Sequence, residues 1–393
     1  MQPVYDLSPT LQLMLVGLLI ALGPLAWVAY RHRRASPLRR AQALTLLTLF
    51  LTFDLVLFGA FTRLTDSGLG CPDWPGCYGS ASPLGAKEEI SAAQAAMPTG
   101  PVTHGKAWIE MIHRYLATSV GVLILVLAVM AWQAARARAS QGQGEPRQTI
   151  TPWWPAFTLV WVCVQGAFGA LTVTMKLFPA IVTLHLMGGL LLLALLCAQA
   201  VQQAQLAGTQ APVRISAGLR TLLWVTFALL AGQVALGGWV STNYAVLACT
   251  DFPKCQGRWW PDMNFVQGFE IWRELGLTGA GEAISFTALT AIHYVHRLAA
   301  FVVLAVLAVL AWRLNSVPEL RRQSRLIAFL ATLQLVTGLS NVVLGWPLLA
   351  AVLHTGGAGA LVVVLTWVAA ASRASAPVVA AGAGLQRVSR MSA

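Results

Sequence analysis

The sequence predicts an all-α polytopic membrane protein: two tandem four-helix transmembrane bundles related by a pseudo-two-fold axis along the membrane normal, plus one extra N-terminal helix. Three observations predict this fold. Of the 393 residues, 57% are hydrophobic and only 10% are charged, whereas soluble domains carry about 25% charged residues. Apolar runs of about 20 residues recur, which is the length a helix needs to cross a bilayer core. An internal repeat relates the two halves.

Nine apolar runs are long enough to span a membrane. They cover about residues 11–30, 42–64, 107–134, 153–174, 180–203, 220–241, 286–312, 326–345 and 348–371. The first run lacks the layout of a cleaved signal peptide, because its basic residues follow the apolar stretch instead of preceding it. We therefore expect it to remain in the protein as a helix.

The net charge is +12, from 26 Lys and Arg against 14 Asp and Glu, and the positions of the basic residues along the chain predict the orientation of the spans. These basic residues lie mainly in short loops and not on a soluble module, which argues against nucleic-acid binding. The loop after the first run holds Arg31, Arg33, Arg34, Arg39 and Arg40, so it is cytoplasmic by the positive-inside rule. Alternation then predicts a periplasmic N-terminus and a cytoplasmic C-terminus in a bacterial inner membrane.

Two long loops, at about 65–106 and 242–285, fall on the outer side. Each holds a pair of cysteines with five residues between them: Cys71 and Cys77, and Cys249 and Cys255. An oxidising compartment permits disulfides there. Each pair is interpreted either as a structural staple or as a redox pair through which electrons or heme pass. The other two cysteines, Cys163 and Cys197, fall within spans and are expected to be packing residues.

The internal repeat rests on three ordered matches. Residues 59–79, GAFTRLTDSGLGCPDWPGCYG, match residues 237–257, GGWVSTNYAVLACTDFPKCQG, at an offset of 178. The second match aligns Glu110, His113 and Arg114 with His293, His296 and Arg297. The third is a glutamine 20 residues before a histidine, Gln165 before His185 and Gln334 before His354. Each unit has an even number of spans, so the two units are parallel repeats.

This repeat defines the predicted domain organisation. The parts are an extra helix with a basic loop at 1–41, a first bundle at 42–205, a linker at 206–219, a second bundle at 220–372 and a cytoplasmic tail at 373–393. We expect the linker to be a polar connection, since its stretch is rich in Gly, Ala and Gln.

Five of the seven histidines fall within spans: His113, His185, His293, His296 and His354. Ionisable residues at such depth are costly and usually functional. His113 and His185 lie roughly 10 Å below the outer surface, at 1.5 Å per helical residue, and His296 and His354 repeat this arrangement. Two imidazoles facing each other across a bundle can provide both axial ligands of a heme iron.

Two other interpretations of these histidines stay open. A single membrane histidine is often only an interhelical hydrogen-bond donor, and a zinc site would need three or four ligands and would recruit cysteines. The duplicated pairs at matched depth favour heme. A Cys-x-x-Cys-His segment is absent from the sequence, so the heme is expected to be noncovalent.

Residues beside the paired histidines add to the heme hypothesis. Small residues follow His185 and His354, and they leave room for a flat macrocycle or simply serve helix packing. Arg114 and Arg297 follow the other two histidines; they would pair with heme propionates or snorkel to the membrane surface.

The two units differ at one chemically important position. Glu110 lies three residues before His113, on the same helix face, and its equivalent in the second unit is His293. A carboxylate at this position can accept or relay protons. We therefore predict that the first unit performs the chemistry and that the second holds a fixed cofactor; a structural Glu110 is the alternative.

Taken together, these sequence features resemble those of the heme A synthase family. The similarity is carried by the two repeat segments quoted above, Glu110-Met-Ile-His113-Arg114, Leu184-His185, FEIWRELG at 269–276, AIHYVHRLAAF at 291–301 and LHTGGAGAL at 353–361. It covers about 42–372, and the chain departs from the usual eight-helix form by its extra first span.

The resemblance implies oxidation of the C8 methyl group of heme O to a formyl group, by successive hydroxylation and dehydration of a gem-diol, giving heme A for terminal oxidase assembly. It implies that His113 and His185 flank the substrate heme, that His296 and His354 ligate a resident heme b, and that Glu110 is the catalytic carboxylate. It ties Cys71 and Cys77 to activity or heme handling, and Cys249 and Cys255 to a structural disulfide.

The partners that the resemblance implies are heme O, the lipid bilayer, a heme O synthase and oxidase assembly factors, with a homo-oligomer also compatible. The heme sites would face the periplasmic side. From the residues alone, two other functions stay open: a bis-histidine b-type cytochrome for electron transfer, and a heme carrier or export protein.

Overall fold

The computed structural model describes residues 7–140 and 151–374 of the chain. Residues 375–393 of the expected tail, residues 141–150 of a predicted cytoplasmic loop and the first six residues lie outside the described residues.

Nine helices in the described part of the chain are long and apolar enough to cross a membrane. They are α1 (Ser8–Arg31), α2 (Pro37–Leu64), α4 (His104–Ala139), α5 (Trp153–Thr174), α6 (Pro179–Leu206), α7 (Ala217–Thr242), α9 (Phe286–Asn315), α10 (Arg321–Val343) and α11 (Leu348–Ala371). They match the nine predicted spans in order, so the all-α multi-pass membrane fold is confirmed. α2 begins at Pro37, so the predicted boundary between residues 41 and 42 falls inside this helix.

Short elements that the sequence analysis did not anticipate lie between the spans. They are α3 (Lys87–Ala96), the 3-10 turns η2 (Ala245–Leu247) and η3 (Pro318–Leu320), α8 (Phe265–Gly268), and the strands β1 (Val213–Ile215) and β2 (Ser372–Ala374). β1 and β2 pair in parallel, with Val213 opposite Ser372. The linker is therefore not only a polar connection, because β1 joins it to the end of α11.

Serine caps mark the starts of three spans. Ser36, Ser216 and Ser285 each accept a hydrogen bond from a backbone N–H in the first turn of α2, α7 and α9. Such a cap satisfies one of the donors that a helix start leaves without a partner. This matters more at a membrane surface, because an unpaired backbone group is costly near hydrocarbon.

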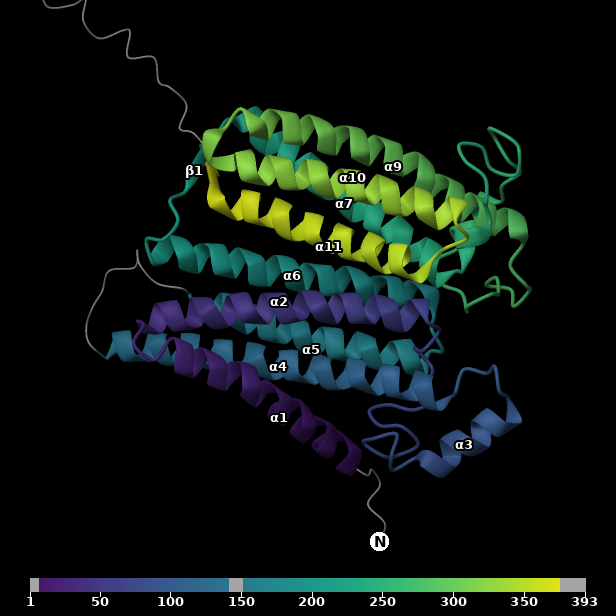
Figure 1. Cartoon of the computed structure of the whole chain (residues 1–393), viewed down its shortest axis with the longest axis horizontal. Coiled ribbons are helices and arrows are strands. Elements are labelled where there is room, and N and C mark those ends of the chain that lie inside the picture. The colour runs from purple at the N-terminus through teal and green to yellow at the C-terminus, as the bar shows by residue number, and fades with distance from the viewer. Residues whose placement is uncertain (1–6, 141–150, 375–393) are drawn as a thin grey trace, which may run out of the picture.

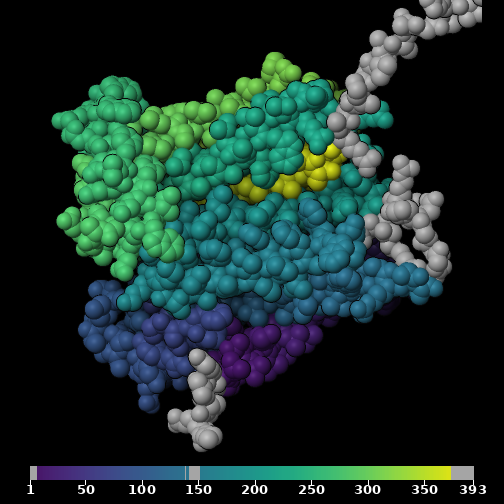
Figure 2. Space-filling view, turned by 180° about the vertical axis from the view of Figure 1, so that it is seen from behind, coloured from purple at the N-terminus to yellow at the C-terminus, as the bar shows by residue number. Residues whose placement is uncertain are grey.

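The spans form two neighbouring sets that share one core (Figure 1). α2, α4, α5 and α6 pack together, as do α7, α9, α10 and α11, and α6 contacts both α7 and α11. Leu190 and Leu193 of α6 belong to the same buried cluster as Leu361 and Leu365 of α11. Both long loops lie at one end of the helices, as Figures 1 and 2 show. The unit boundaries 42–205 and 220–372 stay a prediction.

Contacts between repeat-equivalent residues mark the axis between the two sets. Arg63 Nη2 donates to the carbonyl oxygen of Ser241, 2.6 Å away, and Tyr244 donates to Asp66 at 2.7 Å. Members of each pair are separated by 178 residues, the offset of the repeat. Equivalent residues of two units touch each other where the relating axis passes between them. The axis therefore passes between the outer ends of α2 and α7.

The extra helix α1 lies along α4 and covers the first set from one side (Figure 1). Four of its five buried residues, Pro9, Leu13, Gly17 and Ala21, recur every four positions and form a single stripe. Leu13 reaches the cluster that contains both cysteines of the first outer loop. At Gly17, an added Cβ would lie 2.5 Å from Cγ2 of Thr118 in α4, so this close approach requires glycine.

The two free cysteines differ in environment. Cys197 is buried, as predicted for a packing residue, but Cys163 is exposed on α5. The prediction for Cys163 was wrong because a cysteine fits a lipid-facing position of a span as well as an internal one. Only the rotation of α5 against its neighbours decides between these positions.

We expect Gly17→Val to destabilise the packing of α1 on α4 by about 1–3 kcal/mol, the usual cost of forcing extra atoms into a packed interface. The measurement is the midpoint of thermal unfolding of the purified protein in detergent. Gly23→Val is the matched control, because an added Cβ at Gly23 meets no atom within 4 Å. Equal midpoints for the two variants would contradict this packing of α1.

Candidate functional site

Each of the four paired histidines lies against a glycine of the preceding span. A Cβ added at Gly59 in α2 would lie 3.0 Å from Cε1 of His113, and one added at Gly169 in α5 would lie 3.5 Å from Cε1 of His185. In the second set, Gly237 and Gly338 stand in the same relation to His296 and His354, at 2.9 and 3.2 Å. The missing side chains thus allow each imidazole to occupy the space between two helices.

The fold brings the histidines together in the predicted pairs. His113 lies within electrostatic range of His185, and His296 lies within electrostatic range of His354 and also of His293. All four residues keep part of their surface accessible, whereas the fifth span histidine, His293, is only 3% exposed. In the described residues no group of three or more His, Cys, Asp and Glu side chains could hold a metal ion, so the zinc alternative finds no ligand set there.

The imidazole Nδ1 atoms have different surroundings in the two sets. Thr337 Oγ1 lies 2.9 Å from His354 Nδ1, and Gln233 Nε2 lies 3.1 Å from His296 Nδ1. The Nδ1 atoms of His113 and His185 are buried and have no hydrogen-bond partner among the described residues. The His113 ring stacks on Phe58, with centroids 6.2 Å apart.

The small residues that follow His185 and His354 serve helix packing. An added Cβ at Gly188 or Gly357 would collide with the side-chain amides of Gln165 or Gln334. The glycines facing the rings lie on the preceding spans instead, and the sequence analysis did not single them out. A signal existed, because Gly59 and Gly237 are identities of the repeat, and Gly169 and Gly338 precede their histidines at the same spacing.

Glu110 and Arg114 form a buried ion pair beside His113. Glu110 Oε1 accepts from Arg114 Nη2 at 2.5 Å, and its Oε2 accepts from the backbone N–H of Cys71 at 2.8 Å. The two residues are only 4% and 8% exposed. Both carboxylate oxygens are therefore held, and the carboxylate joins α4 to the first outer loop.

Arg114 also organises the loop that Cys71 and Cys77 close. These cysteines form a disulfide, and Arg114 Nη1 donates to the carbonyl oxygens of Asp73, Pro75 and Gly76. Asp73 in turn accepts from the N–H groups of Tyr78 and Gly79, at 2.6 and 2.7 Å. One guanidinium group and one carboxylate thus bind five backbone groups of the loop.

The second outer loop repeats this construction. Cys249 and Cys255 form a disulfide, and Arg297 donates to the carbonyl oxygens of Asp251 and Lys254. The N–H groups of Gly257 and Gln256 donate to the Asp251 carboxylate and hold its pKa below the ordinary value. Pairing of Arg114 and Arg297 with heme propionates stays a prediction, because their hydrogen bonds here go to the loops and to Glu110.

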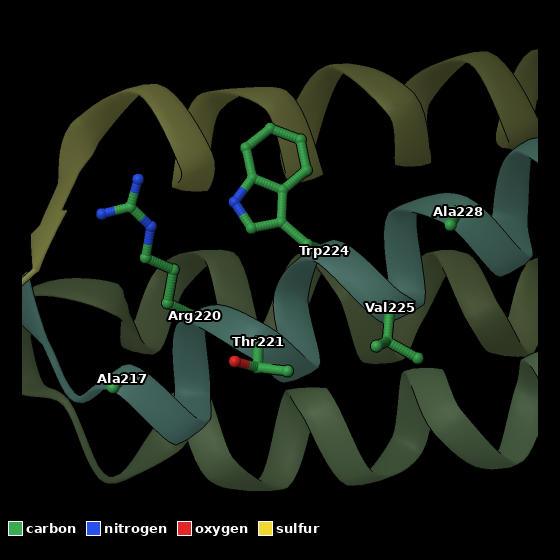
Figure 3. A pocket seen from close by; sticks show the side chains of 6 residues that line it. All are labelled: Ala217, Arg220, Thr221, Trp224, Val225 and Ala228. Atoms are coloured by element: carbon green, nitrogen blue, oxygen red, sulfur yellow. The ribbon is translucent and has the colours of Figure 1, made fainter.

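The hollow beside the N-terminal half of α7 contains none of the predicted site residues. It measures about 510 Å³ and is lined by Ala217, Arg220, Thr221, Trp224, Val225 and Ala228. Arg220 and Trp224 project from one side of the helix, as Figure 3 shows. A cation and an indole at a helix end are typical of the membrane–water interface. This hollow is therefore distinct from the histidine pairs.

Comparison with known proteins gives the chain a family relationship. The model of a family described as cytochrome oxidase assembly protein (COX15-CtaA) matches residues 41–366. A heme A synthase of Shewanella oneidensis is 37% identical over 81% of this chain and 92% of its own length. Heme A synthases of Rhizorhabdus wittichii and Halalkalibacterium halodurans are 28% and 26% identical, over 60% and 53% of this chain and 71% and 62% of their own lengths. The match begins after α1, which lies outside the family model.

We expect Arg114→Gln to destabilise the protein by about 3–5 kcal/mol, because removing one partner of a buried ion pair leaves the other charge buried without compensation. The measurement is denaturant unfolding of the detergent-solubilised protein. Arg258→Gln is the matched control, since the Arg258–Asp262 pair has side chains 65% and 78% exposed, and such pairs contribute at most about 1 kcal/mol. Similar losses in both variants would contradict the structural role of Arg114.

Proposed function

The chain belongs to the heme A synthase family, and on that premise we propose that it oxidises the C8 methyl group of heme O to a formyl group, giving heme A for terminal oxidase assembly. The observation that carries this proposal is a duplicated pair of histidines of which only the first has a carboxylate one helical turn away, Glu110 beside His113. An enzyme with one reacting and one resident heme requires such a difference between its halves.

The residues present fit two hemes. Each pair offers two imidazoles on facing spans, partly accessible and each beside a glycine that leaves space at the ring. We assign His113 and His185 to the substrate heme O, and His296 and His354 to a resident heme b. A heme b between two imidazoles supplies reversible one-electron transfer. An electron-transferring cytochrome would need neither Glu110 nor the difference between the units.

Glu110 is the proposed catalytic carboxylate. Converting a methyl group to a formyl group releases protons, and a carboxylate beside the reacting group can accept them. The bonds from Arg114 and from the Cys71 N–H fix its two oxygens on the face of α4 that carries His113. The Cys71–Cys77 loop therefore positions this carboxylate, which is a physical reason for a link between the disulfide and activity.

We further propose that the outer loops and both heme sites face the periplasm, with a periplasmic N-terminus and a cytoplasmic C-terminus. Each of the two long loops contains one disulfide, both loops lie at one end of the helices (Figure 1), and disulfides persist in oxidising compartments. The opposite end carries the arginine-rich loop between α1 and α2, which suits the cytoplasm. In this arrangement a heme O synthase delivers the substrate and oxidase assembly factors receive the product.

Glu110→Gln is expected to retain heme b and to abolish heme A formation, because the amide cannot accept a proton as the carboxylate does. The measurement is pigment extraction after co-expression with a heme O source. Glu89→Gln, at an exposed position of α3, is the matched control and should form heme A normally. Unchanged heme A in Glu110→Gln would refute the catalytic assignment.

His354→Ala provides the complementary result for the second unit. This variant should lose heme b, because one of two axial ligands is removed. His104→Ala, at the start of α4 in the outer region, should keep it. Heme b bound normally in His354→Ala would refute the resident-heme assignment.

Reporter fusions test the proposed orientation. Alkaline phosphatase, active only outside the cytoplasm, should be inactive at the C-terminus and active when inserted at Gly281 in the second outer loop. Green fluorescent protein at the C-terminus should fluoresce. The reverse pattern would overturn the orientation while leaving the fold unaffected.

A further inference from the structure

We propose that the side chains facing the imidazole Nδ1 atoms decide which unit keeps its heme. Gln233 and Thr337 hold His296 and His354 as permanent ligands, whereas Leu55 and Phe168 at the equivalent positions leave His113 and His185 free to take up and release heme. This inference rests on the proposed division between a substrate heme and a resident heme, and it identifies four positioning residues for that division.

The strongest contact is that of Thr337. Its hydroxyl donates its proton to the carbonyl oxygen of Leu333 at 2.7 Å. The hydroxyl oxygen can therefore act toward His354 only as an acceptor. The same oxygen lies 2.9 Å from His354 Nδ1. His354 is therefore held with its proton on Nδ1 and with the lone pair of Nε2 available to iron.

Gln233 provides the corresponding contact at His296. Its Nε2 lies 3.1 Å from His296 Nδ1 and donates to the His296 carbonyl oxygen at 3.2 Å, whereas its Oε1 has no partner among the described residues. The terminal amide carries both a donor and an acceptor. Rotation of this amide would place Oε1 beside Nδ1, where it would accept the Nδ1 proton of an iron-bound His296, at the cost of the bond that Nε2 now donates to the His296 carbonyl oxygen.

An acceptor at Nδ1 strengthens a histidine ligand in two ways. It fixes the tautomer and the ring orientation, and it makes the imidazole more basic, so that removing such a partner typically lowers metal affinity 10–100-fold. Thr337 supplies such an acceptor to His354, and Gln233 carries one on the amide that lies at His296 Nδ1. A site of this kind suits a cofactor that stays bound through many reaction cycles.

The first unit lacks these partners at the same positions. Leu55 is related to Gln233 by the 178-residue offset of the repeat, and Phe168 directly precedes Gly169 as Thr337 directly precedes Gly338. Neither Leu55 nor Phe168 has a side-chain hydrogen-bonding atom. The Nδ1 atoms of His113 and His185 are correspondingly without partners in the described protein. Such ligands bind iron more weakly, which a site with exchanging substrate and product requires.

The two units differ in the contacts of the imidazole Nδ1 atoms although other features around the histidines and the outer loops recur in both. The glycines against the rings, the arginines that hold the outer loops and the aspartates that accept from the loop N–H groups all recur. The Nδ1 contacts differ within this shared framework.

The test measures heme loss from the purified holoprotein to excess apomyoglobin. Pyridine complexes of the extracted pigments distinguish heme b from heme O, so both rates come from one experiment. Thr337→Val and Gln233→Leu should each accelerate loss of heme b by about 10–100-fold, and Thr337→Ser, which keeps the hydroxyl, should restore the slow rate. Thr332→Val is the matched control, because the Thr332 hydroxyl bonds only within its own helix and is exposed.

A spectroscopic readout separates ligand positioning from loss of packing. With the Nδ1 acceptor removed, the imidazole donates less charge to ferric iron. The midpoint potential of heme b should therefore rise and the ferric electron paramagnetic resonance g-values should shift in Thr337→Val, and both should return in Thr337→Ser. A variant that is merely less stable would show the unaltered spectrum in the fraction that remains folded.

The reciprocal variants test the first unit. Phe168→Thr and Leu55→Gln should slow the loss of heme O while leaving the loss of heme b unchanged. If the wild type loses heme O quickly and heme b slowly, yet neither set of variants changes these rates, the inference is overturned and the proposed function stands. If the wild type instead holds two hemes b that leave at equal rates, the proposed function itself fails, and the inference with it.

Discussion

The close approach of a glycine backbone to each of four imidazoles is the constraint on which the rest of the structure depends. An ionisable ring within a span is costly, and it must lie between helices without separating them. Gly59 and Gly237 leave space for His113 and His296. Because added atoms at these positions would displace the rings, the spacing of the helices and the position of the histidines are set together.

In both units a few polar side chains hold the outer loop in place. One arginine from a span donates to several loop carbonyl oxygens, and one aspartate accepts from two loop N–H groups. Buried backbone groups need such partners. In the first unit alone, this network also holds a carboxylate, Glu110, so the loop that forms the disulfide also fixes the proposed catalytic group.

Duplication explains how one chain can hold two similar sites with different tasks. The helices, glycines and histidines are shared, and the axis between the units passes by Arg63 and Ser241. Near the histidine pairs the two units differ in a few side chains that bear on the ligands: Glu110 against His293, and Leu55 and Phe168 at the sequence positions of Gln233 and Thr337. Changes of this size alter ligand chemistry without altering the packing of the bundles.

The sequence by itself determined the nine spans, the repeat and the position of each histidine along its span, because hydrophobic length and residue spacing are properties of the chain alone. The tertiary structure decided which glycine faces each ring, that Arg114 bonds to the loop and to Glu110, and that Cys163 is exposed. It also decided that Thr337 reaches His354, while His185 Nδ1 has no hydrogen-bond partner among the described residues. These features depend on the rotation of each helix against its neighbours. A membrane-spanning helix is apolar on every face, so its hydropathy does not fix its rotation against its neighbours.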